Sequence, residues 1–411
     1  MKKITFLKTS LAAIIMLTIS SCSKNADKSL TQTTQPKVLT EQMMSENGAN
    51  PDEVAVRERG ESSSETNGSV SKNQEHYVYT ETNAAAGNEI AVYRIKSDGS
   101  LMHKGNVASG GNGTGMGLGS QGAIALDNMH NWLFAVNAGS NTVSSFKVNF
   151  DGSLTLAYTQ KSGGTMPVSL TIHGNLLYVL NHGTDNTSGY WVGANGSLTH
   201  IEGSNRHLSS TAVDAPQISF SPGGNWIIVT EKATNIIGTF YVNNNGAINN
   251  GIFTASVGAT PFGFDFSRGK FMIVSNAAGG APGAGSATSY TLGNTGIPAS
   301  VNGAVPDLQA APCWFATTKN GRFAYTTNTA SNNVSSYYVD EAGNLYLAQA
   351  VVATTDAGPV DIIVSSNNYY VYELNGKAGS IGEYHRTLLG GLWLIGNTYG
   401  LPVSATGLTS F

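Results

Sequence analysis

The sequence predicts an all-β protein, a seven-bladed β-propeller with four-stranded antiparallel blades and a ring closed by the C-terminal strand. Three observations predict this fold. Residues 76–411 contain about seven copies of a repeat of about 48 residues, a period typical of propeller blades. Each copy holds short runs rich in Val, Ile, Tyr and Phe between Gly, Asn and Pro, without long helical periodicity. The two ends of the repeat region also hold complementary parts of one copy.

The repeat is clearest at a turn in which glycine precedes an apolar residue, as in SDGSL, FDGSL and ANGSL. Before each turn the chain has an apolar strand that ends near Asn and a second strand of the type VSSFKV. This order predicts the second, third and fourth strands of a blade. The turn glycines lie at positions 99, 152, 196, 246, 296, 343 and 391.

The first strand of a blade is expected after a proline, as in PVSLTI, PQISFS and PCWFAT. The first copy lacks such a strand, and the last copy is followed by GLPVSATGLTSF with no further strand after it. We therefore expect the C-terminal strand to pair into the first blade. This closure would remove two exposed sheet edges.

The chain begins MKKITFLKTSLAAIIMLTISSC, with basic residues, a short apolar run and small residues before Cys22. This order predicts a secretory signal over residues 1–21, and its end resembles the lipobox of bacterial lipoproteins. The resemblance implies lipidation of Cys22, the alternative being an ordinary cleaved signal. Residues 22–75 are polar and unpatterned, which predicts a flexible tether, and residues 76–411 form the propeller. We expect an outer-membrane lipoprotein of the cell envelope, periplasmic or surface-facing.

Composition narrows the possible partners. The formal net charge is −4, and charged residues make up 12% of the chain, against about 25% in typical soluble proteins. We therefore expect no nucleic-acid partner, and membrane contact only through the lipid on Cys22. The expected protein is a monomer that binds a small molecule, a glycan or a cell-envelope protein. Lipidation of Cys22 would leave Cys313 without a disulfide partner in the chain, and no metal or nucleotide motif predicts a cofactor.

The stretch APQISFSPGGNWIIVTEKATN, residues 215–235, resembles the lactonase family of seven-bladed propellers. That family includes bacterial propeller-type 6-phosphogluconolactonases and fungal carboxymuconate cyclases. The resemblance implies that Glu231 stands where the enzymes have a carboxylate. It also implies that Gln121 replaces a His, that Gln217 and Ile218 replace an Arg-His pair, and that Phe262 replaces an Arg.

These replacements change the expected chemistry. Opening a lactone needs an activated water and a positive charge or donors near the carbonyl oxygen, and a phosphate group usually needs Arg or Lys. We therefore expect no 6-phosphogluconolactonase activity. Gln121, Gln217, Phe262 and Trp314 suit an uncharged, ring-bearing ligand such as a sugar.

Two function classes remain open. One is a non-catalytic protein that binds a glycan or a protein at the propeller face. The other is a hydrolase or cyclase acting on a non-phosphorylated lactone, with Glu231 as general acid or base. Glu231 is otherwise a loop-positioning carboxylate that pairs with Lys232 or with backbone N–H groups, and His182 is either a ligand contact or a solvated loop residue. Asp265 and Asp361 lie on expected first strands, where the simplest reason for a charge is a watery central channel.

Overall fold

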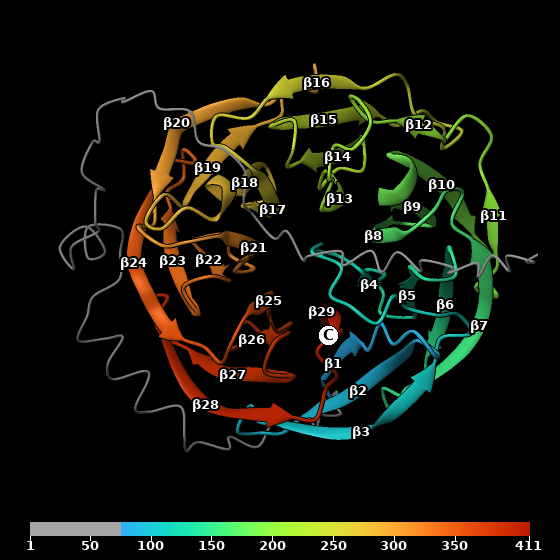
Figure 1. Ribbon diagram of the computed structural model, residues 1–411, viewed down its shortest axis with the longest axis horizontal. Coiled ribbons are helices and arrows are strands. Elements are labelled where there is room, and N and C mark those ends of the chain that lie inside the picture. The colour runs from blue at the N-terminus through green and yellow to red at the C-terminus, as the bar shows by residue number, and fades with distance from the viewer. Residues whose placement is uncertain (1–74) are drawn as a thin grey trace, which may run out of the picture.

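The computed structural model describes residues 75–411, and they form seven antiparallel sheets arranged around a central channel (Figure 1). The predicted propeller is confirmed. In each sheet one strand lies next to the channel and the others follow outward. The predicted signal peptide, Cys22 and nearly all of the predicted tether lie outside the described residues.

The first three blades contain the following strands. Blade 1 has β29 (Thr406–Ser410), β1 (Tyr77–Glu81), β2 (Glu89–Ile95) and β3 (Leu101–Ala108). Blade 2 has β4 (Ile124–Leu126), β5 (Trp132–Asn137), β6 (Thr142–Val148) and β7 (Leu154–Lys161). Blade 3 has β8 (Pro167–His173), β9 (Leu176–Asn181), β10 (Asn186–Val192), β11 (Leu198–His200) and β12 (Arg206–His207).

The remaining four blades repeat the same order. Blade 4 has β13 (Gln217–Phe220), β14 (Trp226–Glu231), β15 (Ile236–Tyr241) and β16 (Ile252–Ala255). Blade 5 has β17 (Pro261–Ser267), β18 (Phe271–Asn276), β19 (Ser286–Thr291) and β20 (Ala299–Pro306). Blade 6 has β21 (Pro312–Thr317), β22 (Phe323–Asn328), β23 (Asn333–Val339) and β24 (Leu345–Thr354). Blade 7 has β25 (Pro359–Val364), β26 (Tyr370–Asn375), β27 (Ser380–Arg386) and β28 (Leu392–Tyr399).

Blade 3 has five strands instead of the expected four, because two short strands share its outermost position. Both β11 and β12 pair with β10, at opposite ends of that strand. Two short 3-10 helices, η1 (His182–Thr184) and η2 (Ala278–Gly280), lie in loops after β9 and β18. In the described part of the chain, no helix is long and apolar enough to cross a membrane.

The ring closes as expected. Strand β29 pairs antiparallel with β1, with Val78 opposite Ser410, and the C-terminus lies near the centre of the ring beside β1 (Figure 1). The ring of Phe411 packs against Tyr77 and His130, with centroid distances of 5.7 and 5.2 Å. The last strand therefore ties both ends of the propeller together.

The repeated turn glycine locks each blade to its neighbour. In six copies it is the expected residue, and it has a left-handed φ between 71° and 85°. A Cβ on Gly99 in blade 1 would collide with Tyr370 in blade 7, and a Cβ on Gly152 would collide with Tyr77. In the last copy the expectation of Gly391 was wrong, because Gly390 has the φ of 81° and lies against Phe323. Because two adjacent glycines fit the repeat here, the sequence did not show which of them takes the turn position.

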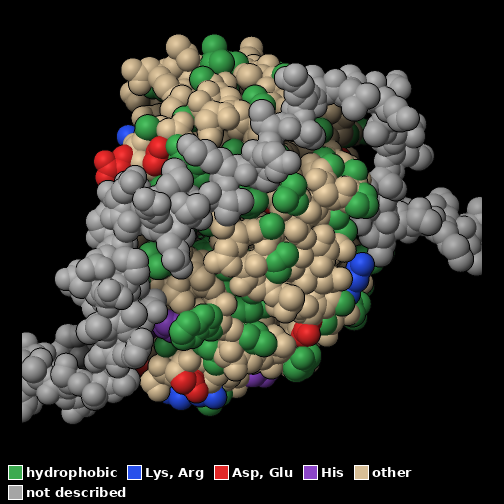
Figure 2. Space-filling view, turned by 90° about the vertical axis from the view of Figure 1, so that its left-hand side faces the viewer, with side chains coloured by type: hydrophobic (Ala, Val, Ile, Leu, Met, Phe, Trp, Pro, Cys, Tyr) green, Lys and Arg blue, Asp and Glu red, His purple; other side chains and the backbone are tan. Residues whose placement is uncertain are grey.

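Apolar side chains fill the space between blades, and the surface carries few charges. Most of the large, fully buried side chains lie on second and third strands, for example Tyr79, Phe134, Tyr178 and Phe240. Figure 2 shows a side of the ring where backbone and neutral polar side chains dominate among scattered apolar and charged groups. This surface agrees with the low charge content of the sequence.

Candidate functional site

The innermost strands enclose a partly open cavity of about 370 Å3 in the central channel. Among the predicted ligand residues, Gln121 and Gln217 line this cavity. Asp265 and Asp361 also line it, as the channel interpretation of their charges expects. We define the upper face of the ring as the face on which the innermost strands begin.

A segment between blades 1 and 2 reaches from blade 2 to blade 6 at the upper end of the channel. We call residues 119–122 the strap. The backbone N–H of Gln121 donates to Pro216 O at 3.0 Å. Its side-chain amide bonds both backbone groups of Phe315 in blade 6, donating to the carbonyl at 2.7 Å and accepting from the N–H at 3.1 Å. The strap therefore joins blade 2 to blades 4 and 6.

Two predicted ligand-binding aromatic residues support this strap. The indole N–H of Trp314 donates to Ser120 O at 2.8 Å, and the rings of Trp314 and Phe262 lie 4.8 Å apart. Phe262 is 3% exposed and Trp314 is 4% exposed. In this arrangement the two rings pack against protein, and their contact with a ligand would require the strap to move.

Glu231 occupies a position at which five other blades have asparagine. It is the last residue of β14 and pairs with the first residue of β15. The equivalent residues in the other blades are Asn137, Asn181, Asn276, Asn328 and Asn375. All of these side chains are buried. The position of Glu231 in the repeat therefore accounts for its burial at the end of β14, whether or not it takes part in a reaction.

The carboxylate of Glu231 is fully buried and holds a loop. It accepts hydrogen bonds from the backbone N–H of Ser209 at 3.0 Å, from the Ser209 hydroxyl, and from the Thr234 hydroxyl at 2.6 Å. Three donors thus occupy its two oxygens. This arrangement matches the loop-positioning interpretation through a backbone N–H group, while Lys232 is directed elsewhere.

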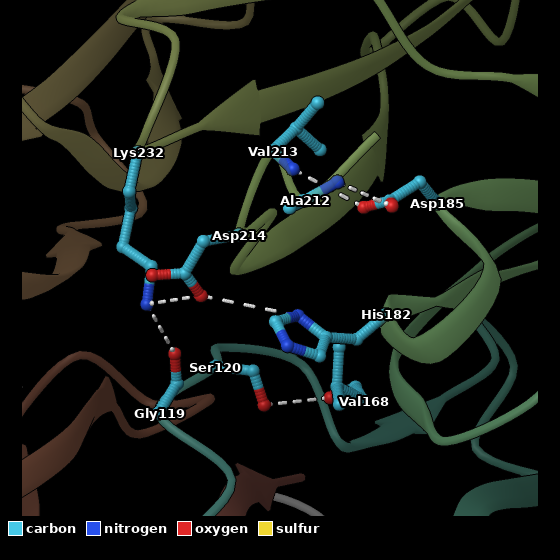
Figure 3. A network of polar contacts seen from close by, with 9 residues as sticks. All are labelled: Gly119, Ser120, Val168, His182, Asp185, Ala212, Val213, Asp214 and Lys232. Carbon is cyan, nitrogen blue, oxygen red and sulfur yellow. Dashed lines mark hydrogen bonds and ion pairs between the residues drawn. The ribbon is translucent and has the colours of Figure 1, made fainter. Parts of the chain in front are cut away.

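The loop held by Glu231, residues 209–214, is fixed at its other end by Asp185. The Asp185 carboxylate accepts from the backbone N–H groups of Ala212 at 2.7 Å and Val213 at 3.3 Å (Figure 3). Ala212 and Asp214 both adopt left-handed conformations, with φ of 57° and 54°. Such backbone conformations are costly for residues with a Cβ and concentrate at ligand and switch regions.

This loop brings Asp214 to two other polar side chains, and we call Asp214, His182 and Lys232 the rim site. Lys232 Nζ lies 3.0 Å from Asp214 Oδ1, and His182 Nδ1 lies 3.9 Å from the same oxygen (Figure 3). The side chains of His182, Asp214 and Lys232 are 32%, 46% and 14% exposed. The three residues come from different loops of blades 3 and 4.

Lys232 is the centre of the rim site. Its ammonium group also donates to Gly119 O of the strap at 3.5 Å and lies 4.8 Å from the centre of the Phe262 ring. The cation is therefore shared between a carboxylate, a carbonyl and an aromatic face. The rim site offers hydrogen-bond donors and acceptors with nearly balanced charge.

Sequence reasoning singled out His182 on its own loop, but it named Lys232 only as a possible partner of Glu231, and it did not identify Asp214. The sequence did hold a signal for Lys232. Side chains alternate between the two faces of a strand, so the side chain that follows a buried Glu231 points to the other face. The left-handed backbone conformations that place Asp214 leave no such pattern in the sequence. In residues 75–411, no cluster of three or more His, Cys, Asp or Glu side chains is suited to a metal ion.

The profile of the family described as Lactonase, 7-bladed beta-propeller, matches residues 69–214. This match spans the strands from β1 to β12. Over these residues the chain is similar to the lactonase family. No curated protein matches this chain in sequence.

Solved structures agree with this fold. A protein from Bacteroides fragilis, described as a candidate 6-phosphogluconolactonase, superposes with a TM-score of 0.62 and 17% identity, covering 84% of this chain and 100% of the other. The periplasmic gluconolactonase of Pseudomonas aeruginosa gives 0.64 and 17%, covering 82% and 98%. A protein from Lactobacillus plantarum gives 0.68 and 17%, covering 82% and 99%. At this identity the similarity shows the fold alone.

Proposed function

We propose that this lactonase-family propeller is a cell-envelope protein that binds an uncharged, hydroxyl-rich ligand such as a glycan at the rim site. The observation that carries the proposal is the balanced group of Asp214, His182 and Lys232, held on fixed loops and partly open to solvent. A sugar hydroxyl both donates and accepts hydrogen bonds, so it can satisfy all three side chains without adding charge.

The same contacts argue against a phosphorylated ligand. Phosphate recognition relies on Arg or Lys groups whose charge is available. Here the Lys232 ammonium is paired with Asp214 and shielded by the Phe262 ring, so a dianion would also face the Asp214 carboxylate. The proposal therefore excludes 6-phosphogluconolactonase activity.

Hydrolysis or cyclisation of a non-phosphorylated lactone is the second candidate, with Glu231 as general acid or base. The family and the fold of the Pseudomonas aeruginosa gluconolactonase favour it. The three donors on buried Glu231 disfavour it, because a base needs access to the proton it removes. A version of this candidate that uses the exposed His182–Asp214 contact would not need Glu231.

The proposed protein is anchored by lipid on Cys22 and acts as a monomer without a cofactor. Residues 22–75 would let the propeller reach ligands or an envelope protein away from the membrane surface. A cell-envelope protein could also bind at the rim site, and competition with a glycan would reveal it.

The test is binding of the full chain, purified in detergent, to an array of neutral glycans and to gluconolactone. Lys232→Met should weaken binding at least tenfold, because it removes the central donor while preserving side-chain length. Lys270→Met is the matched control, since Lys270 lies 4.7 Å from the Phe271 ring but outside the rim site. Equal binding by both variants would refute the rim site. Turnover of gluconolactone that is lost in Glu231→Gln would instead support the second candidate.

A further inference from the structure

The chain enters the ring on the face opposite to the rim site, which we call the lower face. The rim residues follow β9 and β14 or precede β13, so they lie on the upper face. Strand β1 is the second strand of its blade and begins on the lower face. There Glu75 forms an ion pair with Arg94 at 2.8 Å, and a ring nitrogen of His76 lies 3.0 Å from the Ser366 hydroxyl of blade 7. The segment before residue 75 therefore joins the ring at blade 1, next to blade 7.

Blade 2 carries two exposed apolar side chains beside this entry point. Phe150, on the turn after β6, is 92% exposed, and Met129, on the turn after β4, is 76% exposed. The first turn packs on blade 1, because a Cβ on its glycine would lie 2.3 Å from the Tyr77 ring. The second turn holds His130, whose ring packs on Phe411, which packs on Tyr77 in turn. Both turns therefore adjoin the start of β1.

Blade 7 carries exposed aromatic side chains on the other side of the entry point. Tyr369, just before β26, is 47% exposed, and Trp393, near the start of β28, is 64% exposed. The neighbouring Tyr370 hydroxyl donates to Ser97 O of blade 1 at 3.1 Å. The rings of Tyr370, His385 and Trp393 form a row, with centroid distances of 6.1 and 6.3 Å. Blades 7 and 2 thus flank the entry blade on its two sides (Figure 1).

The repeat shows that this placement is not a general feature of the turns. The residue two positions before the turn glycine is Phe150 in blade 2 and Leu388 in blade 7. In the other copies this residue is small, polar or charged, namely Ser97, Ala194, Asn244, Asn294 and Glu341. Large apolar side chains therefore occupy this position in the two blades beside the chain entry. We call Met129, Phe150, Tyr369, Leu388 and Trp393 the entry patch.

The charges around the entry patch nearly cancel. Lys96 and Asp98 are exposed on the turn of blade 1, and Lys147 and Asp151 are exposed on blade 2. This balance gives no net attraction to an anionic surface. Tyr and Trp are enriched where a lipid bilayer meets water, because their rings are apolar and carry a polar group. The entry patch therefore suits the headgroup region of a zwitterionic bilayer.

We propose that the entry patch docks on the surface of a lipid bilayer, with its apolar side chains at the level of the headgroups. This inference rests on the lipid anchor at Cys22, which is part of the proposed function, and it adds a second membrane contact to the one that the sequence predicts. A tether holds the patch near the membrane at an effective concentration on the order of millimolar, so weak docking suffices. Docking directs the rim site, on the upper face, away from the membrane.

The test compares two labelled positions in the full chain, reconstituted from detergent into phosphatidylcholine vesicles that contain brominated lipid. Phe150→Cys places an environment-sensitive maleimide dye in the entry patch. Val403→Cys is the matched control, because Val403 is 67% exposed and precedes β29 on the upper face. Cys313 is buried, and a lipidated Cys22 does not react with the dye. We expect a blue shift and at least twofold stronger quenching at position 150 than at position 403.

A second comparison tests the patch through side chains that carry no dye. Trp393→Ser in the Phe150→Cys chain should weaken the quenching by about half. Tyr399→Ser, which changes an aromatic residue 63% exposed at the other end of β28, should leave the quenching unchanged. Equal losses in these two variants would overturn the proposal, as would equal quenching at positions 150 and 403. A blue shift that appears without vesicles and grows with protein concentration would assign the patch to a second copy of the chain, and would also overturn it.

Flotation of the vesicles separates failure of the anchor from failure of the patch. A chain that does not float with the vesicles would contradict the lipid anchor of the proposed function. The labelled chain carrying Cys22→Ser, titrated with vesicles to about 10 mM lipid, then measures the patch without the anchor. Quenching at position 150 in this titration would support docking, and its absence would overturn it.

Discussion

One buried carboxylate, Glu231, holds the loop beside the rim site, and another, Asp361, lies in the central channel, but the two have different surroundings. Glu231 has three donors on its two oxygens, whereas Asp361 has one oxygen without a partner. Glu231 is the residue that the family resemblance singles out, and Asp361 carries no such resemblance. The difference teaches that the partners of a buried acid indicate its role better than its burial or its place in a family pattern.

The largest expected effect is a loss of thermal stability when part of the channel wall is removed. Deleting residues 400–411 removes β29, the partner of β1, and with it Thr409 and Ser410 of the cavity. Because this deletion exposes the edge of β1, removes the packing of β29 against β25 and opens the ring, we expect loss of cooperative unfolding or a fall in Tm of more than about 10 °C. Circular dichroism during heating measures it. A truncated chain that melts like the full chain would contradict the closure.

The next expected effect tests whether Glu231 holds the loop in place, apart from any catalytic role. Glu231→Ala leaves the Ser209 and Thr234 donors without an acceptor, so we expect a loss of about 1 to 3 kcal/mol in the free energy of unfolding. Glu231→Gln retains an oxygen acceptor and should lose less. Urea unfolding measures both values. A Glu231→Ala variant as stable as the wild type would show that these hydrogen bonds do not hold the loop.

The channel acid predicts a dependence of stability on pH. Burial raises the pKa of Asp361 to about 8, with the backbone amides of Ile362 and Leu408 opposing the shift. Burial likewise raises the pKa of Glu373, on the neighbouring strand β26, to about 8. Both values exceed those of the unfolded chain, about 4. The folded state therefore binds more protons, and the stability that protonation provides is lost as pH rises from about 4 to 8.

We accordingly expect the urea midpoint, measured with a chelator present, to fall between pH 5 and pH 8. Each group contributes at most roughly 1.4 kcal/mol per pH unit. Asp361→Asn and Glu373→Gln should each flatten the profile. A midpoint that rises over this interval in the wild type, or an unchanged slope in both variants, would show that these carboxyl groups are not protonated in the fold.

The smallest effect on stability is expected at the rim. Lys232→Met removes a partly exposed ion pair, which is worth about 0 to 1 kcal/mol, and it retains the packing of the side-chain stem on Phe262. We expect a change in unfolding free energy below about 1 kcal/mol. A much larger loss would show that Lys232 holds the strap and the loop in place, and its effect on binding could then not be assigned to ligand contact.

The sequence alone predicted the repeat, the number of blades and the closure by β29, because each depends on local patterns of strands and turns. It placed the last turn glycine one residue late, since Gly390 and Gly391 fit the pattern equally well. It did not predict the strap, because the contacts between Gln121 and Phe315 join residues 194 positions apart. Segment 111–119, GNGTGMGLG, indicated only a connection between blades.

The sequence predicted only part of the candidate site, because the site also depends on contacts between residues far apart in the chain. Family position located Glu231, position in the repeat located His182 one blade earlier, and strand position located Asp361 in the channel. Asp214 reaches the rim only because Ala212 and Asp214 take left-handed conformations that side chains of Glu231 and Asp185 stabilise. Such tertiary control of backbone conformation leaves little trace in composition or periodicity.

The most direct test of the proposed function compares gluconolactone with 6-phosphogluconolactone as ligands of the wild-type chain. Calorimetric titration should show tighter binding of the unphosphorylated compound, and its binding should weaken at least tenfold in Lys232→Met while Glu231→Gln binds as the wild type does. Tighter binding or rapid hydrolysis of the phosphorylated compound, abolished in Glu231→Gln, would contradict the account.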